Sequence, residues 1–161
     1  MIAELVLTGI LVVALAVLIA WVWHLSPGLQ LRLGGRPDWR LMLDDEDYFR
    51  QALARLFLSR GYLVRGDWVH HDPLDETPRE VMFALERGGT RFAALCVRWI
   101  VPVTSDVIGR FEQSLPATQA NVGMIVTTSI FTEGALERAR GLPVELYDRE
   151  HILKWIEQTW P

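Results

Sequence analysis

The sequence predicts an α/β domain in which helices flank a mixed β-sheet, in the order αβββαβαβα, preceded by one transmembrane helix. The first observation is an apolar run near the start of the chain that contains no Asp, Glu, Lys or Arg. The second is that short apolar runs bounded by Gly or Pro alternate, further along, with segments of helical periodicity. The third is length, because about 135 residues follow the apolar run, enough for one domain with its own core.

The apolar run extends from Leu5 to Leu25. As a helix it would be about 30 Å long, which is the thickness of the hydrocarbon core of a bilayer. Trp21 and Trp23 lie at its end, where aromatic rings favour the membrane interface. A cleaved signal peptide begins with basic residues and ends with small ones, whereas the only early charge here is Glu4. Residues 1–26 are therefore predicted to be an uncleaved transmembrane anchor.

The charges that flank this anchor predict its orientation. Arg32, Arg36 and Arg40 follow the apolar run, whereas only Glu4 and the amino group carry charge before it. Loops rich in Lys and Arg stay on the cytoplasmic side of a membrane. We therefore expect a single-pass protein of the inner (cytoplasmic) membrane, with its N-terminus outside and its C-terminal domain in the cytoplasm.

The folded domain is predicted to cover residues 44–161, after a linker at residues 27–43 that contains two prolines and three glycines. Asp44 to Arg60 predicts a helix, because acidic residues crowd its positive end and apolar residues recur on one face. Gly61 is a typical C-terminal stop. The strand formers in Tyr62 to Val69 then predict a first strand.

The remaining elements follow from similar signals. A hairpin is predicted from two strand-like segments, Val81 to Leu85 and Arg91 to Ile100, because Gly88 and Gly89 lie in the turn between them. The next helix, at residues 105–115, is bounded by a capping Thr or Ser at its start and by a Pro near its end. Continuous apolar runs then predict buried strands. The later predicted elements are helices at 105–115, 132–140 and 149–158, and strands at 122–126 and 143–147.

Charge and cysteine content limit the function classes. The formal net charge is −4, and removing Glu4 with the anchor leaves about −3 (−4 + 1), whereas a dedicated nucleic-acid-binding domain usually has a basic surplus. The single cysteine, Cys96, excludes an internal disulfide and fits a reducing compartment.

Several local strings resemble the Mrr-type restriction endonuclease family. Phe49, the apolar residues that follow it and Gly61-Tyr62 are similar to the family's first helix and strand, and Cys96-x-Arg98-Trp99 is similar to the end of its catalytic strand. The stretch from Val126 to Ala135 resembles its late strand and helix. These strings span about residues 44–158 in order, so the resemblance implies a restriction-endonuclease-like fold for the whole domain.

The resemblance also implies where the family's catalytic residues would stand. Counting from Cys96 places its Gln or Glu at Leu95 and its Lys at Val97. The hairpin aligns without gaps and places the metal-binding Asp at Met82, and the supporting Glu of the first helix, next to Phe49, falls at Arg50. The family uses Mg²⁺, which prefers oxygen ligands. Because all four positions are replaced, we expect no catalytic residue, no metal site and no cofactor.

A second group of residues could bind a phosphate. Strand-ending hydroxyls before a helix N-terminus can hold an anion with backbone N–H groups. The alternative interpretation is helix capping by Thr132 and turn formation by the others, which is the more common role of such residues. The candidate phosphate-binding residues are Thr127, Thr128, Ser129, Thr132, Arg98 and Arg110, with Arg50 as a further member.

Other reactive residues are interpreted as structural. The polar loop at residues 70–80 contains His70, His71, Asp72, Asp75 and Glu76, but adjacent histidines on an extended chain point to opposite faces. Cys96 lies in an apolar strand without an activating base, so we interpret it as an inert thiol. His151 is interpreted as a surface or capping residue.

Three functions remain open from the sequence. The first is a membrane-tethered, catalytically inactive domain that binds double-stranded DNA, which an arginine patch over the former cleft would favour. The second is a protein-interaction scaffold in a membrane complex, which exposure of Met82, Leu95 and Val97 would favour. The third is an active membrane-bound endonuclease with a rebuilt site, which needs carboxylates to reach the cleft; the candidates are Asp72, Asp75 and Glu80.

Overall fold

The computed structural model describes residues 35–70 and 80–161, and the chain divides into two compact units, residues 1–34 and residues 35–161. The predicted anchor at residues 1–26 lies outside the described residues, and so do the loop residues 71–79. None of the helices in the described part is long and apolar enough to cross a membrane.

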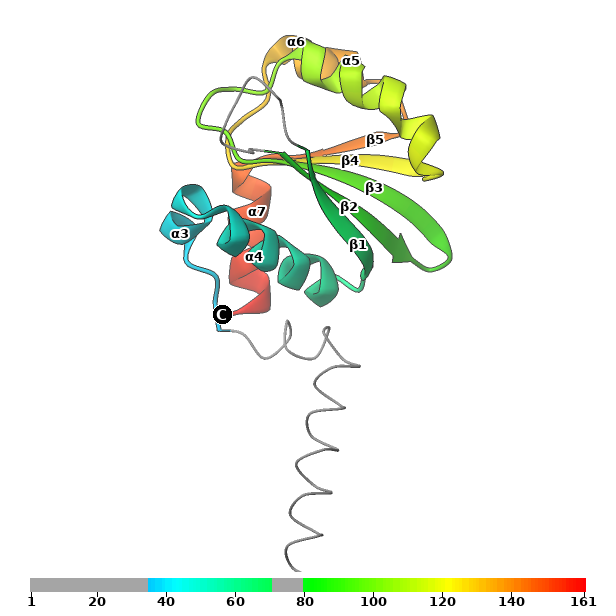
Figure 1. Ribbon diagram of the computed structural model, residues 1–161. Helices are drawn as coiled ribbons and strands as arrows, with labels where there is room; N and C mark the ends of the chain where they lie inside the picture. Colours follow the sequence, from blue (N-terminus) through cyan, green and yellow to red (C-terminus); the bar gives the residue numbers. More distant parts are fainter. Residues whose placement is uncertain (1–34, 71–79) are drawn as a thin grey trace, which may run out of the picture. The chain divides into compact units, whose positions relative to one another are not determined.

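The second unit is built on one five-stranded mixed sheet (Figure 1). The strands lie in their sequence order; the first three are antiparallel, whereas β3, β4 and β5 are parallel to one another. The predicted mixed sheet is therefore confirmed. The strands are β1 (Leu63–His70), β2 (Glu80–Arg87), β3 (Thr90–Val97), β4 (Val122–Thr127) and β5 (Val144–Tyr147).

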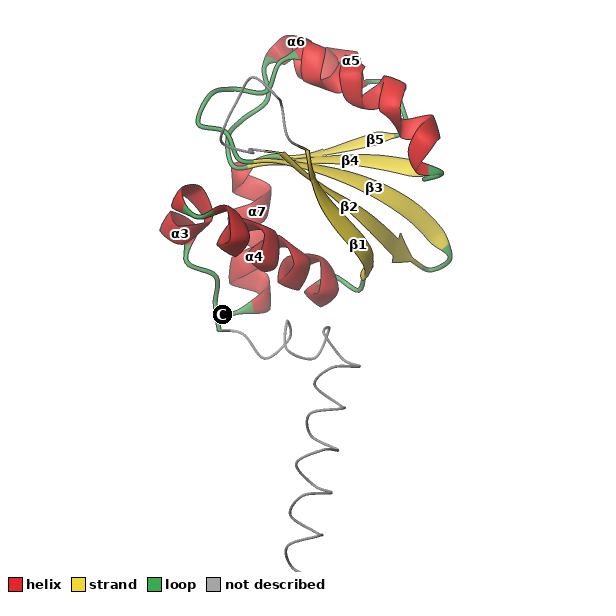
Figure 2. Cartoon of the chain, in the orientation of Figure 1, coloured by secondary structure: helices red, strands yellow, loops and turns green. Residues whose placement is uncertain are grey.

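Helices cover both faces of this sheet: α4 and α7 lie on one face, and α5 and α6 lie on the other (Figure 2). The predicted order αβββαβαβα is confirmed, with one short helix added before it and one 3₁₀ turn added after α5. The helices are α3 (Trp39–Asp44), α4 (Glu46–Ser59), α5 (Ser105–Ser114), the 3₁₀ turn η1 (Leu115–Thr118), α6 (Glu133–Ala139) and α7 (Arg149–Thr159).

The added helix α3 overlaps the predicted linker at residues 27–43. The Asp38 carboxylate caps it by accepting a hydrogen bond from the Arg40 N–H at 2.8 Å, and Met42 is fully buried against the domain. Asp45 separates α3 from α4 and caps the second helix by accepting from the Tyr48 N–H at 2.8 Å. A helix of six residues carries too little periodicity to stand out in the sequence, so the pattern did not predict it.

The β2–β3 hairpin forms as its turn predicts. Gly88 and Gly89 both have positive φ, +58° and +80°, which a glycine adopts without steric cost. The register pairs Met82 with Leu95 and Glu80 with Val97. The third strand ends at Val97 rather than at the predicted Ile100, because the chain then leaves the sheet and Arg98 reaches the carbonyl of Leu43.

The two faces of the hairpin meet different partners. On the α4 face the Phe83 ring contacts Phe57 edge-to-face, with ring centroids 5.4 Å apart. On the α5 face Leu95 and Val97 join a cluster with buried side chains of α5 such as Val107 and Ile108. The sheet therefore separates two apolar layers, and the positions implied by the family resemblance lie in the second.

Candidate functional site

The three strand positions that would carry metal chemistry in the family lie together on the α5 face of the sheet. Met82 and Leu95 are directly paired across the hairpin, and Val97 follows Leu95 by two residues, so their side chains share one face. Val97 and Leu95 are buried, whereas Met82 is half-buried. Of the three, only Met82 has an appreciably accessible side chain.

One carboxylate lies on the same face. Glu80 pairs directly with Val97 and stands two residues before Met82, so it points toward α5. Its carboxylate lies 3.9 Å from the Arg110 guanidinium of α5, and the side chains are 19% and 67% exposed, respectively. A pair at this distance and exposure is worth little to stability, so Arg110 can turn toward an external ligand at small cost.

A hollow of about 650 Å³ opens between this face and α5. Its wall is mainly apolar, with the Glu80 carboxylate and the Arg110 guanidinium as its charged groups. The hollow can therefore receive an apolar group that carries a polar end. Its lining includes Glu80, Met82, Ala84, Leu95, Arg110 and Phe111.

Arg50, the remaining position implied by the family, lies on the other face of the sheet. Its guanidinium donates to Asp67 at 3.1 Å and to Asp47 at 2.8 Å. Asp67 pairs with Phe83, whose ring packs against α4, so this ion pair lies on the α4 face. The structure does not bring Arg50 to the hollow.

The residues of the α5 face do not fit Mg²⁺. The ion needs several oxygen ligands, and Met82, Leu95 and Val97 offer none. Glu80 is a single carboxylate with a guanidinium beside it. Within residues 35–67 and 80–161, whose side chains the structure describes, no three His, Cys, Asp or Glu side chains come close enough to hold a metal ion. Asp72 and Asp75, the other candidates for a rebuilt site, lie outside the described residues.

The predicted phosphate-binding hydroxyls are mostly engaged within the fold. Thr127 accepts a hydrogen bond from the Ser129 N–H at 3.1 Å, and Thr128 donates to the carbonyl of Trp99 at 2.9 Å. Thr132 caps α6 by accepting from the Ala135 N–H at 3.2 Å. The hydroxyl of Ser129 makes no hydrogen bond to any residue that the structure describes. Among the described residues, Ser129 is therefore the one of the four whose hydroxyl is not engaged.

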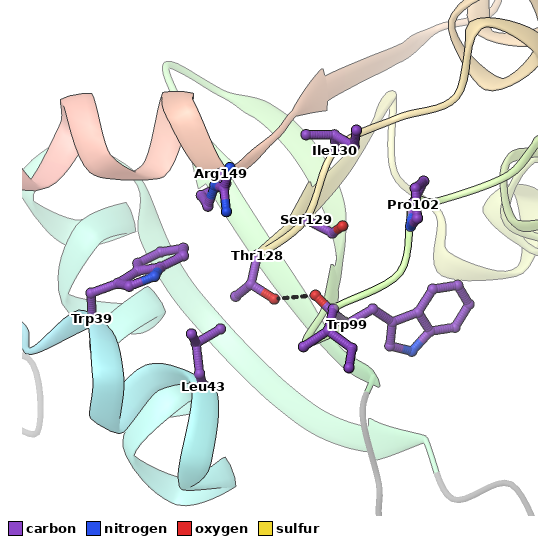
Figure 3. A pocket seen from close by; sticks show the side chains of 9 residues that line it. Trp39, Leu43, Trp99, Pro102, Thr128, Ser129, Ile130 and Arg149 are labelled. Atoms are coloured by element: carbon purple, nitrogen blue, oxygen red, sulfur yellow. Dashed lines mark hydrogen bonds between the residues drawn. The ribbon is translucent and has the colours of Figure 1, made fainter.

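Ser129 and Thr128 line a separate pocket of about 270 Å³ at the carboxyl ends of β3 and β4 (Figure 3). Figure 3 shows Trp39 and Leu43 of α3 on one side of Thr128, with Pro102 beyond Ser129 on the other. Arg149, the first residue of α7, completes the wall, and its N–H donates to the carbonyl of Ser129 at 2.9 Å. Open α/β sheets commonly bind ligands at this edge.

Of the residues that line this pocket, sequence reasoning singled out only Thr128 and Ser129 and missed the others, Trp39 and Arg149 included. Trp39 fell in the predicted linker, and Arg149 was taken only as the start of the last helix. A helix start directly after a parallel strand could have pointed to Arg149, because parallel strands end at a common edge. No local signal places Trp39 beside Ser129, since 90 residues separate them in the chain (129 − 39).

Arg98 plays a structural role. It donates to the Leu43 carbonyl at 2.7 Å, and its Nε is buried without a partner among the described residues. It thereby fixes α3 against the end of β3. Arg50, Arg98 and Arg110 therefore do not gather into one patch: Arg98 and Arg50 are engaged elsewhere, and of the three arginines Arg110 is the one that lines the hollow.

Two further groups are placed clearly. Cys96 is fully buried on the α4 face, and burial raises the pKa of its thiol well above the usual value, which disfavours the reactive thiolate.

Burial alone would raise the pKa of Asp148, the N-cap residue of α7, but hydrogen bonds from the ring and the N–H of His151 outweigh the effect of burial, so the pKa of Asp148 is lowered. His151 thus lies exposed at the cap of α7.

A comparison with protein-family models identifies one family. The Mrr_cat model, described as a restriction endonuclease, matches residues 44–156. One similar solved structure is a protein of unknown function, AF1548, with 19% sequence identity and a TM-score of 0.46; the match covers 63% of this chain and 61% of that one. Another is the DNA modification-dependent restriction endonuclease AspBHI, with 16% sequence identity and a TM-score of 0.48; the match covers 79% of this chain and 37% of that one. This chain therefore covers less than two thirds of either neighbour. No match was found among curated proteins.

Proposed function

The chain belongs to the Mrr-type restriction endonuclease family, and from that premise we propose that it is a member that binds without cutting, held at the cytoplasmic membrane by residues 1–26. The observation that carries the proposal is the chemistry of one face of the hairpin. Met82, Leu95 and Val97 occupy the positions at which the family resemblance places its metal ligands and its Lys. None of the three side chains can bind Mg²⁺ or move a proton.

The loss affects every catalytic group on that face at once. Removing one member of a catalytic set can leave residual activity, because the others still bind and position the substrate. Removing all the metal ligands also removes the activated water and the charge that stabilises the departing oxygen. Burial of Leu95 and Val97 means that these positions now contribute to the core.

Double-stranded DNA is the ligand that family membership favours. Arg110 supports this ligand, because its guanidinium is 67% exposed at the mouth of the hollow and is paired only loosely with Glu80. The acidic net charge of −4 works against strong binding, since duplex affinity depends on neutralising phosphates. We therefore expect DNA binding to be weak and to require low salt.

A protein-interaction scaffold is the second candidate, and the mainly apolar wall of the hollow favours it. A hydrophobic anchor residue from another protein would fit such a hollow better than a phosphate would. In this case the accessible side chain of Met82 would contact the partner, and Arg110 would lie at the rim of the interface.

The test is fluorescence anisotropy of a labelled duplex with the full-length chain in detergent, at low and raised salt, with Mg²⁺ present and the DNA inspected afterwards. Binding that weakens with salt while the DNA stays intact supports the inactive DNA-binding function. Absence of binding at micromolar protein would favour the scaffold. Metal-dependent cleavage that disappears in the Glu80→Gln variant would instead establish a rebuilt active site.

A pair of arginine variants localises any DNA contact. Arg110→Gln should weaken binding and lower the slope of log affinity against log salt by about 1, because one phosphate contact is lost. Arg140→Gln is the matched control, since Arg140 is an exposed arginine at the end of α6 that pairs with Glu137 at 3.3 Å. Equal effects of the two substitutions would show that the hollow is not where DNA binds.

A further inference from the structure

A group of exposed apolar side chains lies at the carboxyl edge of the sheet, beside the pocket of Figure 3. We call it the apolar rim and define it as Ile100, Val101, Pro102 and Ile130. Ile100 is 87% exposed, Val101 56% and Ile130 48%. Single exposed aliphatic residues are ordinary, but several on adjoining segments mark an interaction surface.

The rim is held in place by the backbone. Val103, directly after it, is fully buried, and its N–H donates to the Ile130 carbonyl at 2.8 Å. The Thr132 N–H donates in turn to the Val103 carbonyl at 3.0 Å. These bonds tie the segment after β3 to the segment after β4. The exposed side chains are therefore presented by an ordered surface and need little ordering on binding.

Three residues beside the rim suit a lipid interface. Trp39 of α3 lines the same pocket, and tryptophan is enriched where membranes meet water. Arg149 also lines it, and its guanidinium makes no ion pair with any residue that the structure describes. The Ser129 hydroxyl, which makes no hydrogen bond to any residue that the structure describes, lies in the same wall. A pocket with a cation and a hydroxyl donor is suited to one phosphate group.

We propose that the apolar rim docks into the interface of the lipid bilayer, with Arg149 and Ser129 receiving the phosphate of a phospholipid headgroup. The proposal rests on the membrane tether of the proposed function. The predicted anchor ends at residue 26, and the twelve residues from 27 to 38 can span at most about 42 Å before α3 begins. The domain therefore stays close to the bilayer.

This tether makes even a weak docking surface effective. A tethered domain meets the membrane at a high local concentration, so a few inserted aliphatic side chains can hold it in one orientation. The phosphate group is common to all phospholipids. Docking should therefore occur on phosphatidylcholine and should not require an anionic lipid.

The experiment places an environment-sensitive fluorophore on the rim of the full-length chain. Ile100→Cys and the control Leu63→Cys are each labelled and reconstituted into phosphatidylcholine vesicles with or without brominated lipid. Leu63 is 50% exposed at the opposite end of the sheet, where β1 pairs with β2 beside the hairpin turn. The native Cys96 is fully buried and should stay unlabelled, which the parent chain verifies.

The expected result is that brominated lipid quenches the label at position 100 several-fold more strongly than the label at position 63. Equal, weak quenching of both labels in a chain that resists alkaline carbonate extraction would overturn docking and leave the tether intact. Release of the chain by carbonate would overturn the tether itself. Shielding of position 100 in native membranes but not in pure lipid vesicles would assign the rim to a protein partner and also contradict the proposal.

Two substitutions in the chain labelled at position 100 separate the parts of the surface. Ile130→Asp should reduce the quenching because it places a charge in the rim, whereas Leu63→Asp, at matched exposure, should leave it unchanged. Arg149→Gln should reduce it to a smaller extent. Quenching that is insensitive to Arg149→Gln would remove the headgroup contact from the proposal. Circular dichroism verifies that each variant is folded.

Discussion

The two faces of the β2–β3 hairpin are built from the same two strands but are packed very differently. On the α4 face, Phe83 is fully buried against Phe57, and Cys96 lies in the same closed layer. On the α5 face, Met82 is half-buried, and a hollow of about 650 Å³ separates the strands from part of α5. The first face is packed like a typical core, whereas the second retains open space.

This difference in packing identifies the α5 face as the one with room for a ligand. Protein interiors leave few voids, so an open apolar hollow beside a packed layer is a feature of a binding surface. It adjoins the positions at which the family resemblance places catalytic residues. Leu95 and Val97 extend the core up to its edge, and Glu80 and Arg110 are the charged groups of the hollow.

The largest expected effect comes from Phe83→Ala. It should lower the free energy of unfolding by about 3–5 kcal/mol, because it removes a fully buried ring and leaves a cavity. Met82 directly precedes Phe83 and lies on the opposite face of the sheet. Met82→Ala should lower the free energy of unfolding by about 1 kcal/mol or less, since the side chain already faces open space. Urea denaturation of the full-length chain compares the two. Similar losses would mean that the faces are packed alike.

An intermediate effect is expected from Gly123→Ala on the α5 face. The added Cβ would lie 2.6 Å from Cε1 of Phe111, so the ring must move. The ring borders the hollow and can shift into it, so we expect a loss of about 1–2 kcal/mol, at the low end for overpacking. Gly134→Ala in α6, where a Cβ meets no atom within 4 Å, is the control and should be neutral or stabilising. A larger loss in Gly123→Ala than in Phe83→Ala would contradict the open space.

The smallest effect concerns α7, which covers the α4 face. Folding lowers the pKa of Asp148 below its usual value of 3.8. The ionised carboxylate that caps α7 therefore stabilises the protein at every pH above 3.8, and this contribution is lost as the pH falls through the folded pKa. Asp148→Asn should therefore be less stable than the parent at pH 7, and the gap should narrow below pH 3.8. Urea midpoints at pH 7 and pH 3 measure it. A gap that is independent of pH would show that the carboxylate charge contributes nothing.

Much of the fold could be read from local patterns. The order of strands and helices depends on periodicity over a few residues, and the pairing of β2 with β3 depends on a turn that Gly88 and Gly89 define. The prediction that the catalytic side chains are absent likewise rests on residue identity at Met82, Leu95 and Val97. The prediction of a transmembrane anchor also comes from local hydropathy and stays a prediction.

The candidate site depended on contacts between distant segments. Arg50, Arg98 and Arg110 were grouped by residue type, but the sheet separates Arg50 from the hollow, and Arg98 is engaged by the carbonyl of Leu43. The pocket beside the apolar rim joins Trp39, Ser129 and Arg149, which no spacing in the chain connects. Local patterns specify which elements form, because backbone conformation responds to neighbours along the chain. Packing between elements far apart in the sequence decides on which side of the sheet a charged side chain lies. The same packing decides whether that side chain already forms a hydrogen bond or ion pair within the fold.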